Sequence, residues 1–371
     1  METASHLEIV VKISKHCNLR CAYCYEFAEL GDRARMSLAQ IERLFETLRS
    51  YIDARGDLES VRFAWQGGEP LLVKPAVWRE IDVLARRLFA GTPAPVSHIV
   101  QTNLTALSAD WLDFLKERRF FDDIGVSFDV YGDQRVDVTG RLVNERVLTN
   151  LERLAEAQIP FAAIAVATRQ TLPHLENIRA FFDELGIEAR ILPFNHSADA
   201  GQRADCALTP DEIVDAFCAL FDGWMTSPSA TPVQPLAEYL AYALDHLEGA
   251  PPSEGTADQE SVFVVNTDGR VWGAAELYAP GRDYGNIFET AFSELLRGKN
   301  RLAARKAARE RVMAYCRPCP YFGACPGYAV AFSFPDEIAA LETHGCPVRK
   351  IIAHIVARLV AAAPSEASAC S

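Results

Sequence analysis

Apolar and polar residues alternate along the first half of the chain in a pattern that predicts strands and helices in succession. Six short apolar runs have the length and composition of buried strands: residues 7–13, 59–65, 97–102, 123–128, 160–167 and 188–193. Five stretches between them carry apolar residues every three or four positions, as amphipathic helices do: residues 37–54, 76–90, 108–118, 143–157 and 173–185. The first helix begins with Ser37 and Gln40 at the spacing of a capping box. Strand–helix units in series predict an α/β protein with a parallel sheet.

The pattern then changes, which predicts a second region of different construction. Six units are fewer than the eight of a closed barrel, so we expect residues 1–195 to form a partial (β/α)6 barrel with its chemistry at the C-terminal strand ends. We expect a helical bridging region over 196–258, a small α+β domain over 259–362 and a disordered tail over 363–371. Turn and cap patterns in these regions predict a hairpin and four helices: the hairpin over 261–273, and helices from Thr209 and over 236–248, 298–313 and 347–362.

Composition narrows the classes of function. The chain has 371 residues and a net charge of −13, which argues against a nucleic-acid-binding protein. No apolar run approaches the ~20 residues of a membrane span. The N-terminus lacks the features of a signal peptide, so we expect a cytoplasmic protein that does not bind membranes. In a reducing compartment the ten cysteines are better explained as metal ligands, redox groups or core residues than as disulfides.

Three cysteines form the first candidate site. Cys17, Cys21 and Cys24 have CxxxCxxC spacing in the loop after the first strand. Three thiolates on one loop can bind three irons of a cubane cluster and leave the fourth iron open, as a catalytic site requires. The alternative is a structural zinc site, but the adjacent His16 follows the strand directly and is poorly placed to complete a tetrahedron.

The motif, with Tyr23 before its last cysteine, resembles that of the radical S-adenosylmethionine (SAM) superfamily. Gly67, Gly68, Glu69 and Pro70 follow the second strand and resemble the family's GGEP element. That resemblance implies that the backbone and Glu69 hold the amino group of SAM. It also implies that a reduced [4Fe–4S] cluster cleaves SAM to a 5′-deoxyadenosyl radical, which abstracts a hydrogen atom from substrate. An external one-electron donor of the flavodoxin or ferredoxin type would then be a partner.

The same resemblance extends to the fourth strand. Ser127 matches the position that meets the SAM ribose in the family. The family's next stretch usually reads Ser-Leu-Asp-Gly and ends in Asp-x-x-Arg. This chain has Ser127-Phe128-Asp129-Val130 and then Asp137-Val138-Thr139-Gly140-Arg141, a departure that adds about two residues. Arg141 is therefore implied to bind the SAM carboxylate, with Arg135 as the alternative.

A second group of cysteines lies near the C-terminus. Cys316, Cys319, Cys325 and Cys346 provide four thiolates, enough for a closed iron–sulfur cluster or a structural zinc site. Their order resembles the SPASM extension of peptide-modifying radical SAM enzymes, and it matches the second auxiliary cluster only. Alanines stand where the family has cysteines of the first auxiliary cluster: Ala274 or Ala275, and Ala329. The resemblance therefore implies one auxiliary [4Fe–4S] cluster and about eight irons per chain.

Glu276 is the candidate general base. Sulfatase-maturing members of the family have an Asp near this position, and Glu276 would accept a substrate proton if it faced the cavity. The alternative is that Glu276 is a solvated hairpin residue.

Cys218 lies on an apolar helix face and is predicted to be a core thiol.

The leading hypothesis for function is oxidative modification of a ribosomally made precursor peptide. Residues 65–72 resemble those of maturases that form cyclophanes by joining an aromatic ring to a β-carbon. Thioether formation, epimerisation and decarboxylation are alternatives within the peptide class. Because the chain begins at the barrel, we expect any leader-peptide-binding domain to be a separate protein. The basic stretch 297–311 is either a solvated helix face or a docking site for an acidic leader.

Two other classes of function remain open. One is dehydrogenation or epimerisation of a small molecule such as an aminosugar. The other is a non-catalytic iron–sulfur protein, against which the GGEP element and Ser127 argue because a sensor needs no SAM site.

Overall fold

The computed structural model describes residues 5–117, 119–194, 203–229, 231–249, 260–273 and 279–363. Its centre is a curved sheet with the strand order β10-β9-β8-β1-β2-β3-β4-β5-β6-β7. The six predicted strands are present, all parallel to their neighbours: β1 (His6–Ser14), β2 (Ser60–Gly67), β3 (Val96–Thr102), β4 (Asp123–Ser127), β5 (Ala162–Ala167) and β6 (Ala189–Pro193). The predicted α/β fold with a partial barrel is therefore confirmed.

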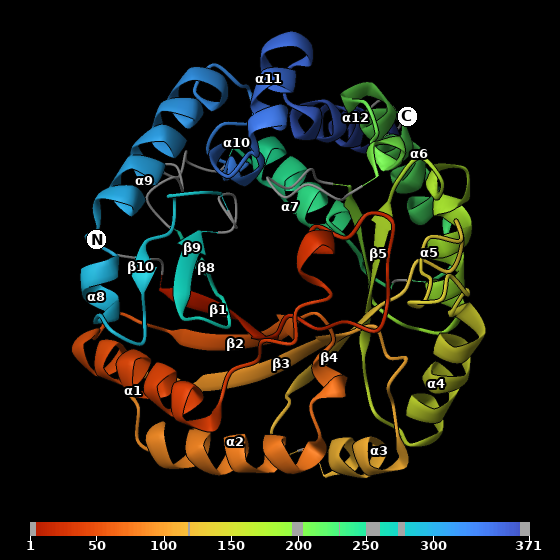
Figure 1. Ribbon diagram of the computed structural model, residues 1–371. Helices are drawn as coiled ribbons and strands as arrows, with labels where there is room; N and C mark the ends of the chain where they lie inside the picture. The colour runs from red at the N-terminus through yellow and green to blue at the C-terminus, as the bar shows by residue number, and fades with distance from the viewer. Residues whose placement is uncertain are drawn as a thin grey trace, which may run out of the picture.

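Five helices cover the outer face of this sheet (Figure 1): α1 (Leu38–Ala54), α2 (Pro75–Leu88), α3 (Ala109–Lys116), α4 (Asn144–Glu156) and α5 (Leu175–Glu184). The predicted capping box at the start of α1 is present, with Ser37 accepting from the Gln40 amide and Gln40 accepting from the Ser37 amide. The ends of the helices lie within three residues of those predicted, because the amphipathic period is strong in each one.

The alternation of side chains along the strands separates the core from the barrel interior. On β1, Ile9 and Val11 join the core between sheet and helices, whereas Val10 and Lys12 face inward. The outer core contains stacked aromatic rings around His98, which lies 4.4 Å from the Phe120 ring centroid. Burial lowers the pKa of His98 to about 3, so this imidazole is a neutral core residue that accepts from Trp65 Nε1.

The hairpin of the C-terminal region extends the barrel sheet. β8 (Val262–Val265) pairs in parallel with β1, and β9 (Arg270–Gly273) pairs antiparallel with β8. The short β10 (Gly285–Asn286) follows β9, and β7 (Val233–Gln234) lies beside β6 at the other edge. The sheet thus continues past the predicted domain boundary at residue 259. The physical reason is that β1 would otherwise be an edge strand with unpaired backbone groups.

The remaining helices lie beyond the open side of the barrel, except α8, which lies beside α1 (Figure 1). They include α6 (Pro210–Thr226), α7 (Leu236–Leu247), α8 (Phe292–Leu295), α9 (Lys299–Arg311), α10 (Tyr328–Ala331), α11 (Pro335–His344) and α12 (Pro347–Ala362). The four predicted helices correspond to α6, α7, α9 and α12. α12 packs on α6 and α7, and the Asp222 carboxylate binds Arg358 and His354 across that contact. Within the described ranges, no helix combines the length and apolar character of a membrane span.

Candidate active site

The three cysteines after β1 line a cavity at the C-terminal ends of the barrel strands. Its volume is about 440 Å³. The structure brings most of the predicted site residues to its walls: Cys17, Cys21, Tyr23, Cys24, Gly67, Gly68, Ser127 and the alternative arginine, Arg135. Gln101, Thr102 and Asn103 from the end of β3 also line it. This is the end of a β/α barrel at which catalytic groups gather.

The cysteine loop is held by backbone hydrogen bonds on both sides. The Cys17 amide donates to Leu30, and the amides of Arg20 and Ala22 donate to the carbonyls of Val136 and Gln134. Burial raises the pKa of the Cys17 thiol to about 12 and raises the pKa values of the Cys21 and Cys24 thiols. Buried thiols of this kind become good ligands once a positively charged metal centre stabilises the thiolates. Three such thiols beside an open, partly polar cavity fit a [4Fe–4S] cluster with one free iron.

The two glycines of the GGEP element lie against the backbone of the β1 loop. Gly67 has φ +129°, and the Gly68 amide donates to the Ser14 carbonyl over 2.7 Å. A Cβ atom at Gly67 would collide with the Ser14 carbonyl, and one at Gly68 would collide with the His16 carbonyl. Glycine is thus required here for close approach of two loops that both line the cavity.

Glu69 lies behind the cavity wall and is fully buried. Its Oε1 accepts from the Leu71 amide at 2.8 Å and from Thr102 Oγ1 at 2.6 Å, and its Oε2 accepts from the Asn103 amide at 2.7 Å. The carboxylate therefore ties the loop after β2 to the end of β3. Glu69 and the buried Pro70 are not among the lining residues, so in this structure Glu69 positions the wall.

We expect Glu69→Gln to lower the free energy of unfolding by about 2 kcal/mol. The Glu69 carboxylate accepts three hydrogen bonds, and in glutamine an NH2 group, which cannot accept, would face at least one of these donors. Urea unfolding monitored by far-UV circular dichroism measures this. The control is Glu117→Gln, which removes an exposed ion pair with Arg79 and should cost less than about 1 kcal/mol. Equal losses in the two variants would contradict a special role for the Glu69 network.

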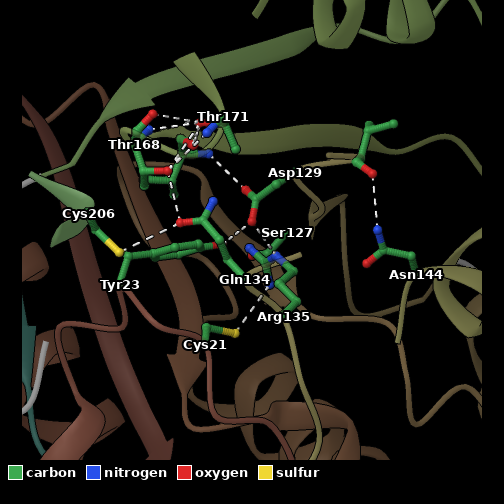
Figure 2. Close-up of polar contacts among 12 residues, drawn as sticks. Cys21, Tyr23, Ser127, Asp129, Gln134, Arg135, Asn144, Thr168, Thr171 and Cys206 are labelled. Atoms are coloured by element: carbon green, nitrogen blue, oxygen red, sulfur yellow. Dashed lines mark hydrogen bonds and ion pairs between the residues drawn. The ribbon is translucent and has the colours of Figure 1, made fainter. Parts of the chain in front are cut away.

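A buried polar network lies beside Cys21 (Figure 2). Asp129 Oδ2 accepts from Tyr23 Oη at 2.6 Å and from Arg135 Nε at 2.9 Å, and Asp129 Oδ1 accepts from the Val166 amide. The Arg135 guanidinium also lies over the Tyr23 ring, 5.5 Å from its centroid. The network fixes both the aromatic residue of the cysteine motif and the arginine at the cavity wall.

Arg141 lies elsewhere. It is exposed on a turn in which its amide donates to Asp137 Oδ1, and it does not line the cavity. The structure therefore brings Arg135, the alternative, to the cavity in place of Arg141. The segment before Arg135 turns through residues of positive φ at Val130, Gly132 and Asp133, and this backbone path leads to Arg135 at the cavity wall.

The network continues to a segment distant in the sequence (Figure 2). Gln134 Oε1 accepts from Thr168 Oγ1 at 2.8 Å and lies 3.7 Å from the thiol of Cys206, which is fully buried. The Arg203 amide donates to the carbonyl of Ala22 within the cysteine loop. Residues 203–206 thereby pack on the loop, and Cys206 is part of the core.

Lys12, Glu26 and Tyr25 form a group that the sequence analysis did not single out. Lys12 is 1% exposed; its ammonium lies 2.5 Å from Glu26 Oε1 and 2.5 Å from Tyr25 Oη. Lys12 and Tyr25 both line the cavity, with Gln66 beside them. The signal that could have revealed this group is a lysine in an otherwise apolar strand, which must find a partner when buried.

The four C-terminal cysteines line a second cavity of about 230 Å³. The Cys319 amide donates to the Cys316 carbonyl, and Gly327, at φ +75°, passes close to the Cys316 thiol. Burial raises the pKa of the Cys316 thiol to about 12 and that of Cys325 to about 11. Four thiols around one cavity provide the ligand set of a closed iron–sulfur cluster. In the described part of the chain, no three His, Cys, Asp or Glu side chains are arranged to hold a single metal ion.

A third cavity, of about 380 Å³, lies between these two. It shares Pro193, Phe194 and Phe334 with the first cavity, and Gly345 and Cys346 with the second. Its walls are largely apolar and come from α6, α7, α11 and α12. The three cavities therefore run in sequence from one cysteine group to the other.

Two predictions have different outcomes in the C-terminal region. Glu276, Ala274 and Ala275 lie outside the described residues.

In the basic stretch 297–311, Arg301 is buried and pairs with Glu260 at 2.8 Å, and Arg311 donates to the carbonyls of Val330 and Ala331. At least these two basic side chains hold α9 in place, which leaves less charge for an acidic leader.

Comparison with known proteins agrees with this geometry. A sequence model of the radical SAM superfamily matches residues 11–182, so the barrel of this chain belongs to that superfamily. Beyond the barrel, the chain is similar in sequence to anaerobic sulfatase-maturating enzymes. It is 26% identical over 304 residues to the cysteine-type enzyme of Clostridium novyi, covering 78% of this chain and 79% of the relative. It is 22% identical to the serine-type enzyme of Bacteroides thetaiotaomicron, covering 87% and 82%.

Solved structures share the fold. The structure of anSMEcpe with bound AdoMet has a TM-score of 0.73 at 20% identity and covers 96% of this chain and 94% of that one. The structure of Streptococcus suis SuiB bound to its precursor peptide SuiA has a TM-score of 0.61 at 16% identity, covering 90% and 75%. Both similarities extend beyond the barrel into the C-terminal region.

Proposed function

We propose that this enzyme oxidatively modifies a ribosomally made precursor peptide and forms a cyclophane-type C–C bond between an aromatic side chain and a β-carbon. The observation that carries the proposal is the series of cavities that joins the three-cysteine site to the four-cysteine site. The named relatives act in sulfatase maturation, and SuiB was solved with a precursor peptide. The resemblance of residues 65–72 to cyclophane-forming maturases supports the choice of bond.

In this proposal the cofactors are two [4Fe–4S] clusters and SAM. Cys17, Cys21 and Cys24 would hold the cluster that, when reduced, supplies the radical chemistry with SAM. The residues Gly67 and Gly68 would offer the backbone to the amino group of SAM. Ser127, whose hydroxyl accepts from Gln101 Nε2 at 2.7 Å, would meet the ribose. Cys316, Cys319, Cys325 and Cys346 would hold the auxiliary cluster.

The middle cavity supports a peptide as the substrate. The middle cavity is apolar and large enough for side chains next to the reacting residue of a peptide. Glu276 is retained as a candidate base for the proton lost on crosslinking. A flavodoxin or ferredoxin would supply electrons, and a leader-peptide-binding protein is a candidate partner.

We assign the SAM carboxylate to Arg135, and this assignment predicts different effects for two matched variants. Arg135→Gln should weaken SAM binding about tenfold or more, because it removes a charged donor from the cavity wall. Arg141→Gln should change the affinity less than about twofold, since Arg141 is exposed and does not line the cavity. Anaerobic equilibrium dialysis with labelled SAM measures both. The opposite ranking would restore Arg141 as the partner.

The proposed function is tested by the mass of a peptide. The enzyme is co-expressed anaerobically with the short open reading frame beside its gene, and the peptide is analysed by mass spectrometry. We expect a loss of two hydrogens that is absent with Cys17→Ala, and fragmentation should place the crosslink at an aromatic residue. An unchanged peptide with continued cleavage of SAM in vitro would contradict an oxidative crosslink and favour a small-molecule substrate.

A further inference from the structure

A buried ion pair borders one of the three thiols that would hold the catalytic cluster (Figure 2). Arg135 Nη1 lies 3.9 Å from Cys21 Sγ, within hydrogen-bond reach of sulfur. Arg135 and Asp129 are 6% and 2% exposed, so water screens their charges little. The guanidinium is thus the positive end of a buried pair that contacts a predicted cluster ligand.

The pair is fixed in this position from several sides. Asp129 is held by the Tyr23 hydroxyl and the Val166 amide as well as by Arg135. The loop between Asp129 and Arg135 includes Val130 at φ +65° and Asp133 at φ +49°, conformations that cost free energy for residues with side chains. A strained loop that delivers an arginine to a thiol is a sign of a functional constraint on the position of that arginine.

Charge next to a cluster ligand changes how readily the cluster is reduced. A reduced [4Fe–4S] cluster carries one more negative charge than the oxidised cluster. A cation beside a cysteine sulfur stabilises that added charge, and a nearby anion opposes it. Hydrogen bonds to the sulfurs and net charge are recognised determinants of cluster potentials.

We propose that Arg135 tunes the catalytic cluster toward the reduced state through Cys21, and that Asp129 both positions Arg135 and limits this effect. The proposal rests on the proposed function, because it requires a cluster at Cys17, Cys21 and Cys24. Arg135 acts here as a positioning and tuning residue on the ligand. This role is separate from its contact with SAM and is present when SAM is absent.

The test is potentiometry of the reconstituted full-length enzyme without SAM. Electron paramagnetic resonance follows the one-electron reduction of the cluster at a series of poised potentials. The signal of the auxiliary cluster is obtained from the variant with alanine at Cys17, Cys21 and Cys24, and is subtracted. The variants are Arg135→Gln, Arg135→Lys and Asp129→Asn. The control is Arg86→Gln, which breaks an exposed ion pair with Asp82 on helix α2, outside the barrel cavity.

We expect Arg135→Gln to lower the ratio of reduced to oxidised cluster about tenfold at a fixed potential, equivalent to a shift of about 59 mV to more negative values. Arg135→Lys should keep a potential near that of the wild type, and Asp129→Asn should shift it to more positive values. Arg86→Gln should leave the potential unchanged. Unchanged potentials in both Arg135→Gln and Asp129→Asn would overturn the proposal.

Iron content separates the possible failures. If wild-type enzyme takes up no iron at the three cysteines, the proposed function itself fails. If Arg135→Gln alone loses its cluster, the Asp129→Asn variant provides the test. A more positive reduction potential in Asp129→Asn supports the proposal, and an unchanged or more negative potential overturns it.

Discussion

Replacing Cys17, Cys21 and Cys24 together with alanine is expected to abolish formation of 5′-deoxyadenosine, a loss of about 1000-fold or more. These three are the cysteines among the lining residues of the barrel cavity, so their loss removes the ligands of the cluster that would reduce SAM. Iron should fall from about eight to about four atoms per chain. The measurements are an iron assay and quantification of 5′-deoxyadenosine after anaerobic incubation with SAM and dithionite.

Cys218→Ala is the matched control for this experiment. Cys218 lies on α6 and packs against the core with no place in any of the three cavities. Iron content and SAM cleavage should stay within about twofold of the wild type. Wild-type rates of SAM cleavage in the triple variant would show that the barrel cavity is not the radical site.

The strands and helices of the barrel could be predicted from the sequence because each is encoded locally. Strand β2, for example, is a largely apolar run that ends at Gly67, and Gly68 follows it; both glycines allow two loops to approach closely. Helix α1 has its capping box and a single apolar face. In both cases the signal lies within about twenty residues, so periodicity and turn chemistry are sufficient.

Long-range pairing could not be predicted in the same way. The parallel pairing of β8 with β1 joins residues about 250 positions apart, and nothing local in either strand specifies the partner. The burial of Lys12 beside Glu26 likewise depends on how the cysteine loop folds back over β1. Such contacts arise when a free sheet edge or a buried charge is satisfied by whatever the tertiary fold brings near it.

The two candidate arginines show how a motif can mislead at the level of a single side chain. Counting from Ser127 favours Arg141, because the family's arginine closes an Asp-x-x-Arg pattern. The loop instead turns through left-handed residues at Val130 and Asp133, which brings Arg135 to the ion pair with Asp129. Of the two arginines, Arg135 is the one that lines the cavity, because the backbone path before it leads there.

Replacing Cys316 and Cys319 with alanine is expected to separate the two clusters functionally. Iron should fall from about eight to about four atoms per chain. Cleavage of SAM should remain within about threefold of the wild type, because none of the four C-terminal cysteines lines the barrel cavity. Peptide product should be lost, since the second cysteine group borders the cavity proposed for the substrate.

Elemental analysis of the wild-type enzyme distinguishes an iron–sulfur cluster from zinc at the four-cysteine site. Two [4Fe–4S] clusters give about eight irons and no stoichiometric zinc, which elemental analysis of the wild type measures directly. One tightly bound zinc, absent from the Cys316 and Cys319 variant, would make this site structural. Because Cys346 caps α12, which packs on α6 and α7, loss of a structural metal should also lower the unfolding temperature. Loss of product without loss of stability would then point to a role of the auxiliary cluster in the reaction itself.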